Sequence, residues 1–211
     1  MFVNDILLNR HKIFLFRLAK ISACCIILSS CTALKLSNEP IFIESFDSRQ
    51  EFLDKLDSWE FRSRIAIKVG EEGFNGKLHW IQTSNKSYLT LNGPIGFGAL
   101  KIKSNGVIVS LTDINGNKSV LENPETDIFN IYGWHIPINS FQYWILGIPN
   151  PSAKKEFTVD ENGLMSWLQQ GNWEINISRY RKFSGQKMPY ILKMSNSDTD
   201  INIIIDKWMF N

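Results

Sequence analysis

Apolar and polar residues alternate along most of the chain, with the period of two that half-buried strands show. The clearest run covers 61–69, where Phe61, Ile65 and Ile67 share one parity and basic residues occupy most of the other. Short turn signals separate the runs, including Asn-Gly pairs that favour tight hairpins. The pattern therefore predicts an antiparallel meander with strands near 61–69, 77–80, 88–91, 99–104, 106–112, 117–121, 155–160, 164–169, 172–180, 188–196 and 200–208.

Three segments show helical spacing instead. Asp47 followed by Gln50 resembles a capping signal, and the apolar residues that follow predict a helix from about 47 to 58. A second helix is expected over 124–132, because a proline and an acidic first turn are typical of a helix start. A third is expected from Asn139 or Ser140 to about Leu146, where glycine and proline follow.

Eleven strands and three helices indicate a mainly β, α+β fold. Long antiparallel sheets twist and curl, so we expect a strongly curved half-barrel whose concave face is covered by the helices. Two interiors satisfy this pattern: a solid core, or a pocket under a helical lid. The residues alone favour the solid core, because small half-barrels often fill with side chains.

The first thirty residues have the composition of an export signal. Basic residues between positions 10 and 20 precede an apolar stretch at 21–28, and Ser29, Ser30 and Cys31 follow in the order of a lipoprotein-type cleavage box. The uninterrupted apolar run is about half of the 20 or so residues that a membrane span needs. We therefore expect 1–30 to be a signal peptide, with cleavage before Cys31 and lipid on that cysteine.

Cleavage would change the charge balance of the chain. Residues 1–30 hold four of its 23 basic residues and one of its 21 acidic residues, so 19 and 20 remain and the formal charge moves from +2 to −1. The processed chain therefore lacks the basic excess of a nucleic-acid-binding protein. We expect 31–44 to be the lipidated N-terminus and a tether, and 45–211 to be a single, monomeric domain.

Candidate catalytic chemistry is sparse. After cleavage Cys31 is the sole cysteine and only His79 and His135 remain of the histidines, so we expect neither a disulfide nor a metal site. The sequence has no Gly-x-Ser-x-Gly nucleophile elbow and no phosphate-binding loop. The expectation is a protein that is not an enzyme and has no cofactor beyond its covalent lipid.

One loop has an unusual composition. In Gly93-Pro94-Ile95-Gly96-Phe97-Gly98, two large apolar residues lie among glycines and a proline, where a turn is expected. Apolar residues on an exposed tip usually contact a partner or a membrane. The same two side chains would equally fit a core, and composition leaves both readings open.

Several sequence blocks together resemble the outer-membrane lipoprotein receptor LolB family. They occur in order at 61–67, 80–82, 88–91, 93–96, 136–149, 169–173, 188–189 and 205–208, with Tyr180 among them. The block at 136–149, IPINSFQYWILGIP, is the most specific. The resemblance covers nearly all of 59–208 and includes the lipoprotein box.

This resemblance replaces the solid-core expectation, because the family encloses an apolar cavity for the acyl chains of lipoproteins. It implies a receptor that accepts lipoproteins from the periplasmic carrier LolA and inserts them into the outer membrane. The chain would be held by its lipid anchor on the periplasmic face of that membrane. The family's membrane-insertion loop carries an apolar residue, usually leucine; Ile95 occupies that position, with Pro94 and Phe97 beside it.

Strand parity and helix faces nominate the candidate cavity residues, and ordinary core packing explains each of them equally well. These residues are Ile65, Ile67, Leu78, Trp80, Ile128, Ile131, Trp144 and Ile145. Two other functions stay open. One is a lipid-binding carrier closer to LolA, although a lipoprotein box argues against a soluble carrier. The other is a structural or envelope-assembly lipoprotein with a filled core and no acyl-chain transfer.

Overall fold

The computed structural model describes residues 45–94 and 99–210. The lipidation site Cys31 and the loop residues Ile95 and Phe97 lie outside these residues, as do the expected signal peptide and tether. Pro94 is the last described residue before the gap and is exposed.

The first described element is helix α2 (Phe46–Asp54), which corrects the sequence-based prediction at both ends. Its N-cap is Ser45, whose side chain accepts a hydrogen bond from the Ser48 backbone N–H at 3.2 Å. Asp47 therefore lies in the first turn and is not the cap. The helix stops four residues earlier than expected, because the chain is extended again from Ser58.

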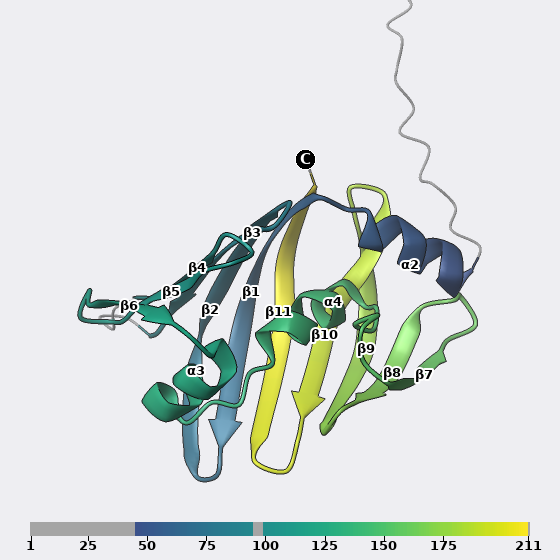
Figure 1. The fold of residues 1–211 in the computed structure, drawn as a ribbon. Coiled ribbons are helices and arrows are strands. Elements are labelled where there is room, and N and C mark those ends of the chain that lie inside the picture. Colours follow the sequence, from purple (N-terminus) through teal and green to yellow (C-terminus); the bar gives the residue numbers. More distant parts are fainter. Residues whose placement is uncertain (1–44, 95–98, 211) are drawn as a thin grey trace, which may run out of the picture. The chain divides into compact units, whose positions relative to one another are not determined.

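Eleven antiparallel strands form one sheet, as the alternation predicts (Figure 1). Their bounds are β1 (Ser58–Val69), β2 (Glu72–Thr83), β3 (Lys86–Asn92), β4 (Ala99–Ser104), β5 (Val109–Thr112), β6 (Lys118–Leu121), β7 (Lys155–Val159), β8 (Met165–Gln170), β9 (Trp173–Phe183), β10 (Gln186–Ser195) and β11 (Thr199–Phe210). The expected meander is correct within β1–β6 and within β7–β11. The two runs join where β1 pairs with β11, for example at Ile65 and Ile203.

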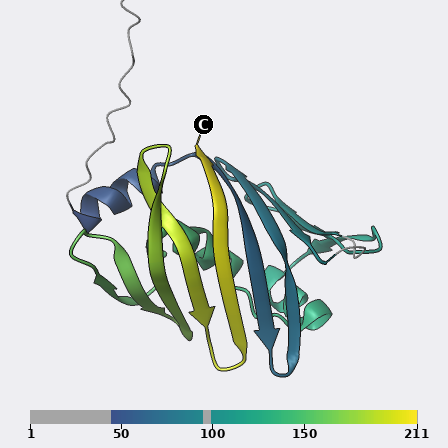
Figure 2. The same cartoon turned by 180° about the vertical axis from the view of Figure 1, so that it is seen from behind.

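Two further helices connect the opposite edges of the sheet. After edge strand β6, the chain forms α3 (Pro124–Tyr132) and α4 (Ile138–Leu146) and then enters β7 at the other edge. The bounds of α3 match the prediction, whereas α4 begins one or two residues earlier than the expected cap, with Pro137 as its N-cap. Both helices lie in front of the concave face of the sheet, and within 45–94 and 99–210 no helix lies on its convex face (Figures 1 and 2).

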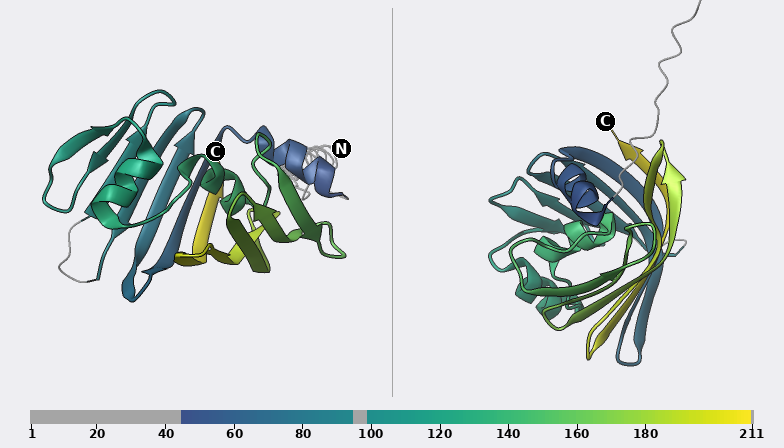
Figure 3. Two further views of the ribbon diagram at one scale, coloured as in Figure 1. Left: turned by 60° about the horizontal axis from the view of Figure 1, so that its bottom comes forward. Right: turned by 90° about the vertical axis from the view of Figure 1, so that its right-hand side faces the viewer.

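The sheet is curved (Figure 3). Its outer face is polar and its inner face is apolar. Along β1, residues of the parity of Phe61, Ile65 and Ile67 are buried, while Arg62 and Arg64 of the other parity are exposed. The same division continues across β2 and β11. The main core therefore lies between the concave face and the helices, which is where a ligand of this domain would have to fit.

Candidate functional site

An apolar pocket lies between one half of the concave face and the helices. Its wall on the sheet consists of residues that share the inward parity of β1 to β4 and β11: Ile65, Ile67, Leu78, Trp80, Leu89, Leu91, Leu100, Ile102 and Ile201. Aliphatic side chains predominate, with Trp80 as the one aromatic residue of this wall. This surface offers dispersion contacts and no hydrogen-bonding group apart from one indole.

The opposite wall comes from α3, α4 and the segment between them. It consists of Ile128, Trp134, Ile136, Ile138 and Phe141. Phe141 stacks on Trp80 with 5.6 Å between ring centroids, and Trp134 lies 5.5 Å from the ring of Phe74 on β2. These two contacts hold the helical layer against the sheet.

Gly133 makes the sharp exit from α3 possible. It ends the helix in the left-handed conformation, at φ +72°, and its N–H donates to the carbonyl of Phe129 at 2.7 Å. A residue with a β-carbon would be strained at this φ. The chain therefore turns back at once and brings Trp134 and Ile136 over the sheet.

The apolar pocket is nearly filled. Its volume is about 50 Å³, which is the room of one or two water molecules at about 30 Å³ each. An acyl chain does not fit in that space. In this conformation the apolar pocket is packed, as the residues alone favour, and it does not show the acyl-chain cavity that the family resemblance implies.

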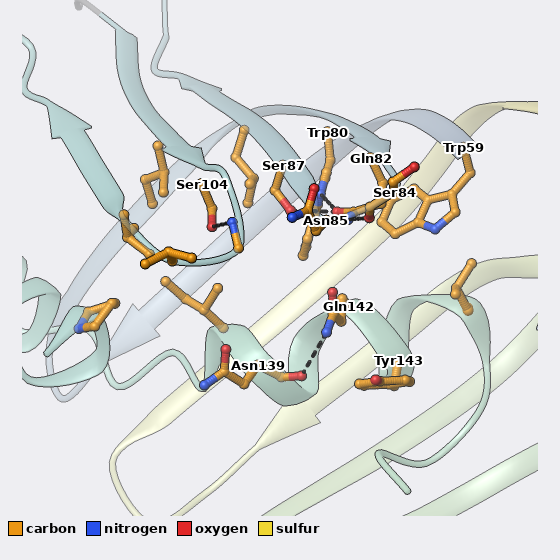
Figure 4. Close-up of a pocket in the computed structure, with 18 of the residues that line it drawn as sticks. Trp59, Trp80, Gln82, Ser84, Asn85, Ser87, Ser104, Asn139, Gln142 and Tyr143 are labelled. Atoms are coloured by element: carbon orange, nitrogen blue, oxygen red, sulfur yellow. Dashed lines mark hydrogen bonds between the residues drawn. The ribbon is translucent and has the colours of Figure 1, made fainter. Parts of the chain in front are cut away.

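A larger groove of about 820 Å³ opens beside the apolar pocket. One side is formed by the β2–β3 and β4–β5 hairpin ends together with the link from α2 to β1, and the other side by α4 and the start of α3 (Figure 4). Figure 4 shows Ser84, Asn85 and Ser87 on the sheet side, facing Asn139 and Gln142 across the groove. Its lining therefore mixes polar and apolar side chains, unlike that of the apolar pocket.

Gln82 organises the polar floor of the groove. It is buried, and its Oε1 accepts hydrogen bonds from Trp80 Nε1 at 3.3 Å and from the Ser87 hydroxyl at 2.5 Å. Its Nε2 donates to the Ser84 carbonyl at 2.7 Å. These bonds fix the β2–β3 hairpin end and position the Trp80 indole at the boundary between polar and apolar surface.

Four residues line both spaces: Trp80, Leu89, Ile102 and Ile138. The polar groove and the apolar pocket are therefore neighbours that share a wall, and a molecule lying in the groove contacts the entrance to the pocket. This arrangement suits an amphiphile, with a polar group in the groove and a hydrocarbon chain directed under the helices.

Acidic residues line the groove without basic ones. Asp54, Asp57 and Glu125 belong to its lining, and across 45–94 and 99–210 no Lys or Arg does. Partial burial raises the pKa of Glu125 above its ordinary value, because burial disfavours the charged carboxylate.

The C-terminal half of α4 is tied to the other half of the sheet. Trp144 Nε1 donates to Gln170 Oε1 at 2.7 Å, and Gln170 Nε2 donates to the Asn150 carbonyl at 2.8 Å. Arg49 of α2 donates through Nη2 to the Leu146 carbonyl at 3.4 Å, 5.7 Å from the ring of Tyr180. Burial lowers the pKa of the Arg49 guanidinium. α2 and α4 are thereby fastened to β8, β9 and β10.

The structure brings together five of the eight nominated cavity residues. Ile65, Ile67, Leu78, Trp80 and Ile128 line the apolar pocket.

The other three nominated residues lie elsewhere. Ile131 is 52% exposed and lines neither space. Trp144 and Ile145 are buried, with Trp144 5.9 Å from Trp173 of β9. They follow Phe141 by about one turn of α4 and Ile138 by about two turns, so the first turns of the helix cover the pocket and the last turn covers β8 to β10.

Sequence reasoning missed more than half of the pocket lining. Leu89, Leu91, Leu100 and Ile102 follow the same inward parity as the nominated strand residues, so extending that rule to β3 and β4 would have found them. Trp134 and Ile136 lie in an irregular segment between two helices, where no period indicates which side chains face inward.

Two further observations concern the described residues. No helix among them is both long enough and apolar enough to cross a membrane. The same residues contain no group of three His, Cys, Asp or Glu side chains that would hold a metal ion.

Solved structures share this open curved sheet with helices over its concave face. The solved structure of the LolA superfamily protein NE2245 from Nitrosomonas europaea matches 79% of this chain and 94% of its own, with a TM-score of 0.52 and 9% sequence identity. At that identity the likeness concerns the fold alone.

The chain belongs to the LolB family. The family model described as "Outer membrane lipoprotein LolB" matches residues 57–208. The chain is 28% identical over 186 residues to the outer-membrane lipoprotein LolB of Pseudomonas paraeruginosa, covering 86% of this chain and 90% of the relative. It is 29% identical over 157 residues to that of Pseudomonas fluorescens, covering 74% and 77%. The family resemblance is thus confirmed, and the protein is an outer-membrane lipoprotein.

Proposed function

We propose that this protein receives lipoproteins from a LolA-like periplasmic carrier and inserts them into the outer membrane, binding their acyl chains in the apolar pocket under α3. The observation that carries the proposal is the shared wall formed by Trp80, Leu89, Ile102 and Ile138. It joins an open polar groove to a surface lined by apolar side chains, as an amphiphilic ligand requires.

The energetics explain why such a receptor is needed. Each methylene transferred out of water contributes about 0.8 kcal/mol, so an acyl chain of about fifteen carbons in water is penalised by roughly 10 kcal/mol. Lipoproteins with several chains need an escort across an aqueous gap. With no nucleotide-binding motif in the sequence, the transfer runs down a gradient of affinity that ends in the membrane.

Binding requires the helical layer to move, because 50 Å³ does not hold an acyl chain. Helix α3 is the element suited to this movement. Ile128 is its single buried side chain in the structure. The Tyr132 hydroxyl is buried and has no hydrogen-bond partner among the described residues, and such a group typically costs about 1–3 kcal/mol. Lifting α3 must therefore break few contacts, chiefly the packing of Ile128 and the contact of the adjoining Trp134 with Phe74.

The first experiment measures acyl binding with a fluorescent fatty acid, used throughout as its uncharged methyl ester. Ile102→Glu and Ile138→Glu place a carboxylate on the shared wall, and we expect each to weaken binding at least about tenfold, because a charge cannot be buried against hydrocarbon without a partner. Ile114→Glu is the matched control, since Ile114 is 54% exposed in a hairpin turn outside both spaces.

Circular dichroism establishes that each variant is folded before its affinity is compared. If the unaltered protein shows no saturable binding of the probe, the proposal is wrong and the structural or envelope-assembly function is favoured instead. Equal affinity of all three folded variants would move the site away from the shared wall.

The delivery step is assigned to the loop that follows Pro94. We expect Ile95→Glu to leave acyl binding intact and to block the release of lipoprotein into liposomes, because a charged tip would not enter a bilayer. Ile108→Glu, at an exposed position in a different hairpin, is the control. Delivery at the normal rate by Ile95→Glu would remove this role from the loop; adding Phe97→Glu then shows whether Phe97 shares it.

The lipid on Cys31 is proposed to anchor the protein and not to fill its site. The processed chain carrying Cys31→Ala should bind the fluorescent fatty acid with unchanged affinity. Loss of binding would show that the covalent lipid is part of the pocket.

A further inference from the structure

The charged side chains that line the polar groove are unbalanced: they are acidic, without basic partners in the same lining. Asp54, the last residue of α2, and Asp57, in the link to β1, approach it from one side, and Glu125 approaches from the start of α3. Three carboxylates from two sides of one groove, with no basic side chain in the lining of the described structure, make its potential negative at neutral pH.

The basic residues closest in sequence do not offset this charge. Lys55 follows Asp54 directly, but its Nζ is bonded to Glu51 Oε1 at 2.6 Å. Lys86 follows the β2–β3 turn and is exposed on the outward parity of β3, which it shares with Tyr88. The acidic lining therefore has no cation facing it from its own elements.

The N-terminus of α3 is also part of the groove, and a free helix N-terminus attracts anions. Here the end is neutralised by its own side chain, because Asp127 Oδ2 accepts a hydrogen bond from the Asn123 backbone N–H at 3.0 Å. Glu125 adds a second carboxylate in the same turn. The helix end thus offers no anion site that would compensate the three lining carboxylates.

We infer that the groove selects uncharged acyl-glyceryl groups and rejects phosphate-bearing lipids. The inference rests on the proposed function, in which the acyl chain lies in the adjoining apolar pocket. A hydrocarbon pocket does not distinguish the chains of a lipoprotein anchor from those of the phospholipids around it. Serine and amide side chains in the groove suit neutral ester and amide linkages, whereas a phosphate would be repelled by the three carboxylates.

Selection against phospholipids keeps a receptor at a membrane surface free for lipoproteins. A receptor anchored in a bilayer meets phospholipid in large excess over lipoprotein. If its pocket accepted both, it would be saturated by the membrane itself. A negative groove over the pocket keeps the site available for cargo whose glyceryl linkage bears no charge.

The test compares two ligands that carry the same hydrocarbon chain. Monolauroylglycerol and lauroyl lysophosphatidylglycerol each displace a fluorescent fatty acid from the full-length protein, at concentrations at which neither forms micelles. We expect the uncharged ligand to bind at least about tenfold more tightly, which corresponds to about 1.4 kcal/mol. Raising the salt concentration should narrow the difference, because screening shortens the range of the repulsion.

The variant Asp54→Asn/Asp57→Asn/Glu125→Gln should bring the ratio of the two dissociation constants to within about twofold, by strengthening binding of the anionic ligand. The matched control Glu156→Gln/Glu161→Gln/Asp198→Asn removes three exposed carboxylates outside the groove and should keep the ratio of the unaltered protein.

Equal affinity of the unaltered protein for both ligands would overturn the inference and leave the proposed function standing. The inference would also be overturned if the ratio of the two dissociation constants stayed unchanged in Asp54→Asn/Asp57→Asn/Glu125→Gln. Failure of both ligands to displace the fatty acid, or failure of the fatty acid to bind, would overturn the proposed function itself.

Discussion

The two helices over the concave face are alike in length and differ in how they are held. α4 buries Phe141, Trp144, Ile145 and Leu146 and is tied by hydrogen bonds to Gln170 and Arg49. α3 buries only Ile128, and its apolar Phe129 and Ile131 are 39% and 52% exposed. The last turn of the fastened helix covers β8 to β10, whereas the loosely held helix covers the apolar pocket together with the first turns of α4.

This difference assigns separate tasks to the two ends of the concave face. The end under the last turn of α4 is permanent core, which gives the domain its stability. The end under α3 has the same apolar character but few bonds that keep it closed. A receptor for hydrocarbon needs such a place, where apolar surface is covered without a ligand and becomes available when one arrives.

The largest expected effect on the free energy of unfolding comes from a matched pair of substitutions. Ile145 on α4 and Ile128 on α3 are 0% and 1% exposed. We expect Ile145→Ala to lower the free energy of unfolding by about 2–5 kcal/mol, the usual cost of a core cavity. Ile128→Ala should cost less than half as much, because α3 can detach while the rest stays folded. Urea denaturation measures both values.

Hydrogen exchange distinguishes the two sites further. Ile128→Ala should accelerate exchange of the α3 amides alone, whereas Ile145→Ala should affect the whole domain. The two variants could instead lose the same free energy of unfolding, with faster exchange throughout the domain in both. That result would mean that α3 is packed as firmly as α4.

An intermediate effect on the free energy of unfolding is expected when Gln170 is replaced. Replacing it with leucine removes the acceptor of the buried Trp144 indole N–H and of the Asn150 backbone N–H, while keeping a buried side chain of similar size. A buried donor left without its partner costs about 1–3 kcal/mol, so the free energy of unfolding should fall by that amount in a denaturant titration. Gln169→Leu, on the next residue of β8 and bonded only to the Gly171 carbonyl, is the control and should change stability much less.

The smallest expected effect is a pH dependence at Glu125. Its folded-state pKa is raised by burial, so the folded protein binds this proton more tightly than the unfolded chain does. Stability from this group therefore falls as pH rises from the unfolded pKa, about 4.3, through the folded pKa. Glu125→Gln should raise stability at pH 7 by less than ~0.5 kcal/mol and should give no gain below pH ~4. A gain of equal size at both pH values would contradict this cause.

Much of the fold follows from periodicity. Strand alternation locates all eleven strands, and helical spacing with Pro124 locates α3 to the residue. The pairing of β1 with β11 does not follow, because alternation fixes which face a residue occupies and carries no information about which strand lies beside it. The start of α2 was misplaced because Ser45 and Asp47 are both good capping residues and only the three-dimensional path chooses between them.

The site is predictable where it lies on strands and not where it depends on helix direction. Ile65, Ile67, Leu78 and Trp80 line the pocket as parity predicts. Ile131 and Trp144 belong to apolar helices, but the sequence does not tell toward which part of the sheet each turn points. The polar groove was not anticipated at all, because its residues come from two hairpin ends, the segment that joins α2 to β1, and two helices, which only the folded topology brings together.

The central claim is that acyl chains enter the pocket under α3, and a photoreactive fatty acid tests it most directly. After irradiation of its complex with the protein, mass spectrometry identifies the residues that carry the label. We expect labelling of the inward residues of β2 to β4 and of 128–141, and we expect monolauroylglycerol to reduce this labelling. Labelling confined to β7–β9, or labelling that no competitor reduces, would contradict it.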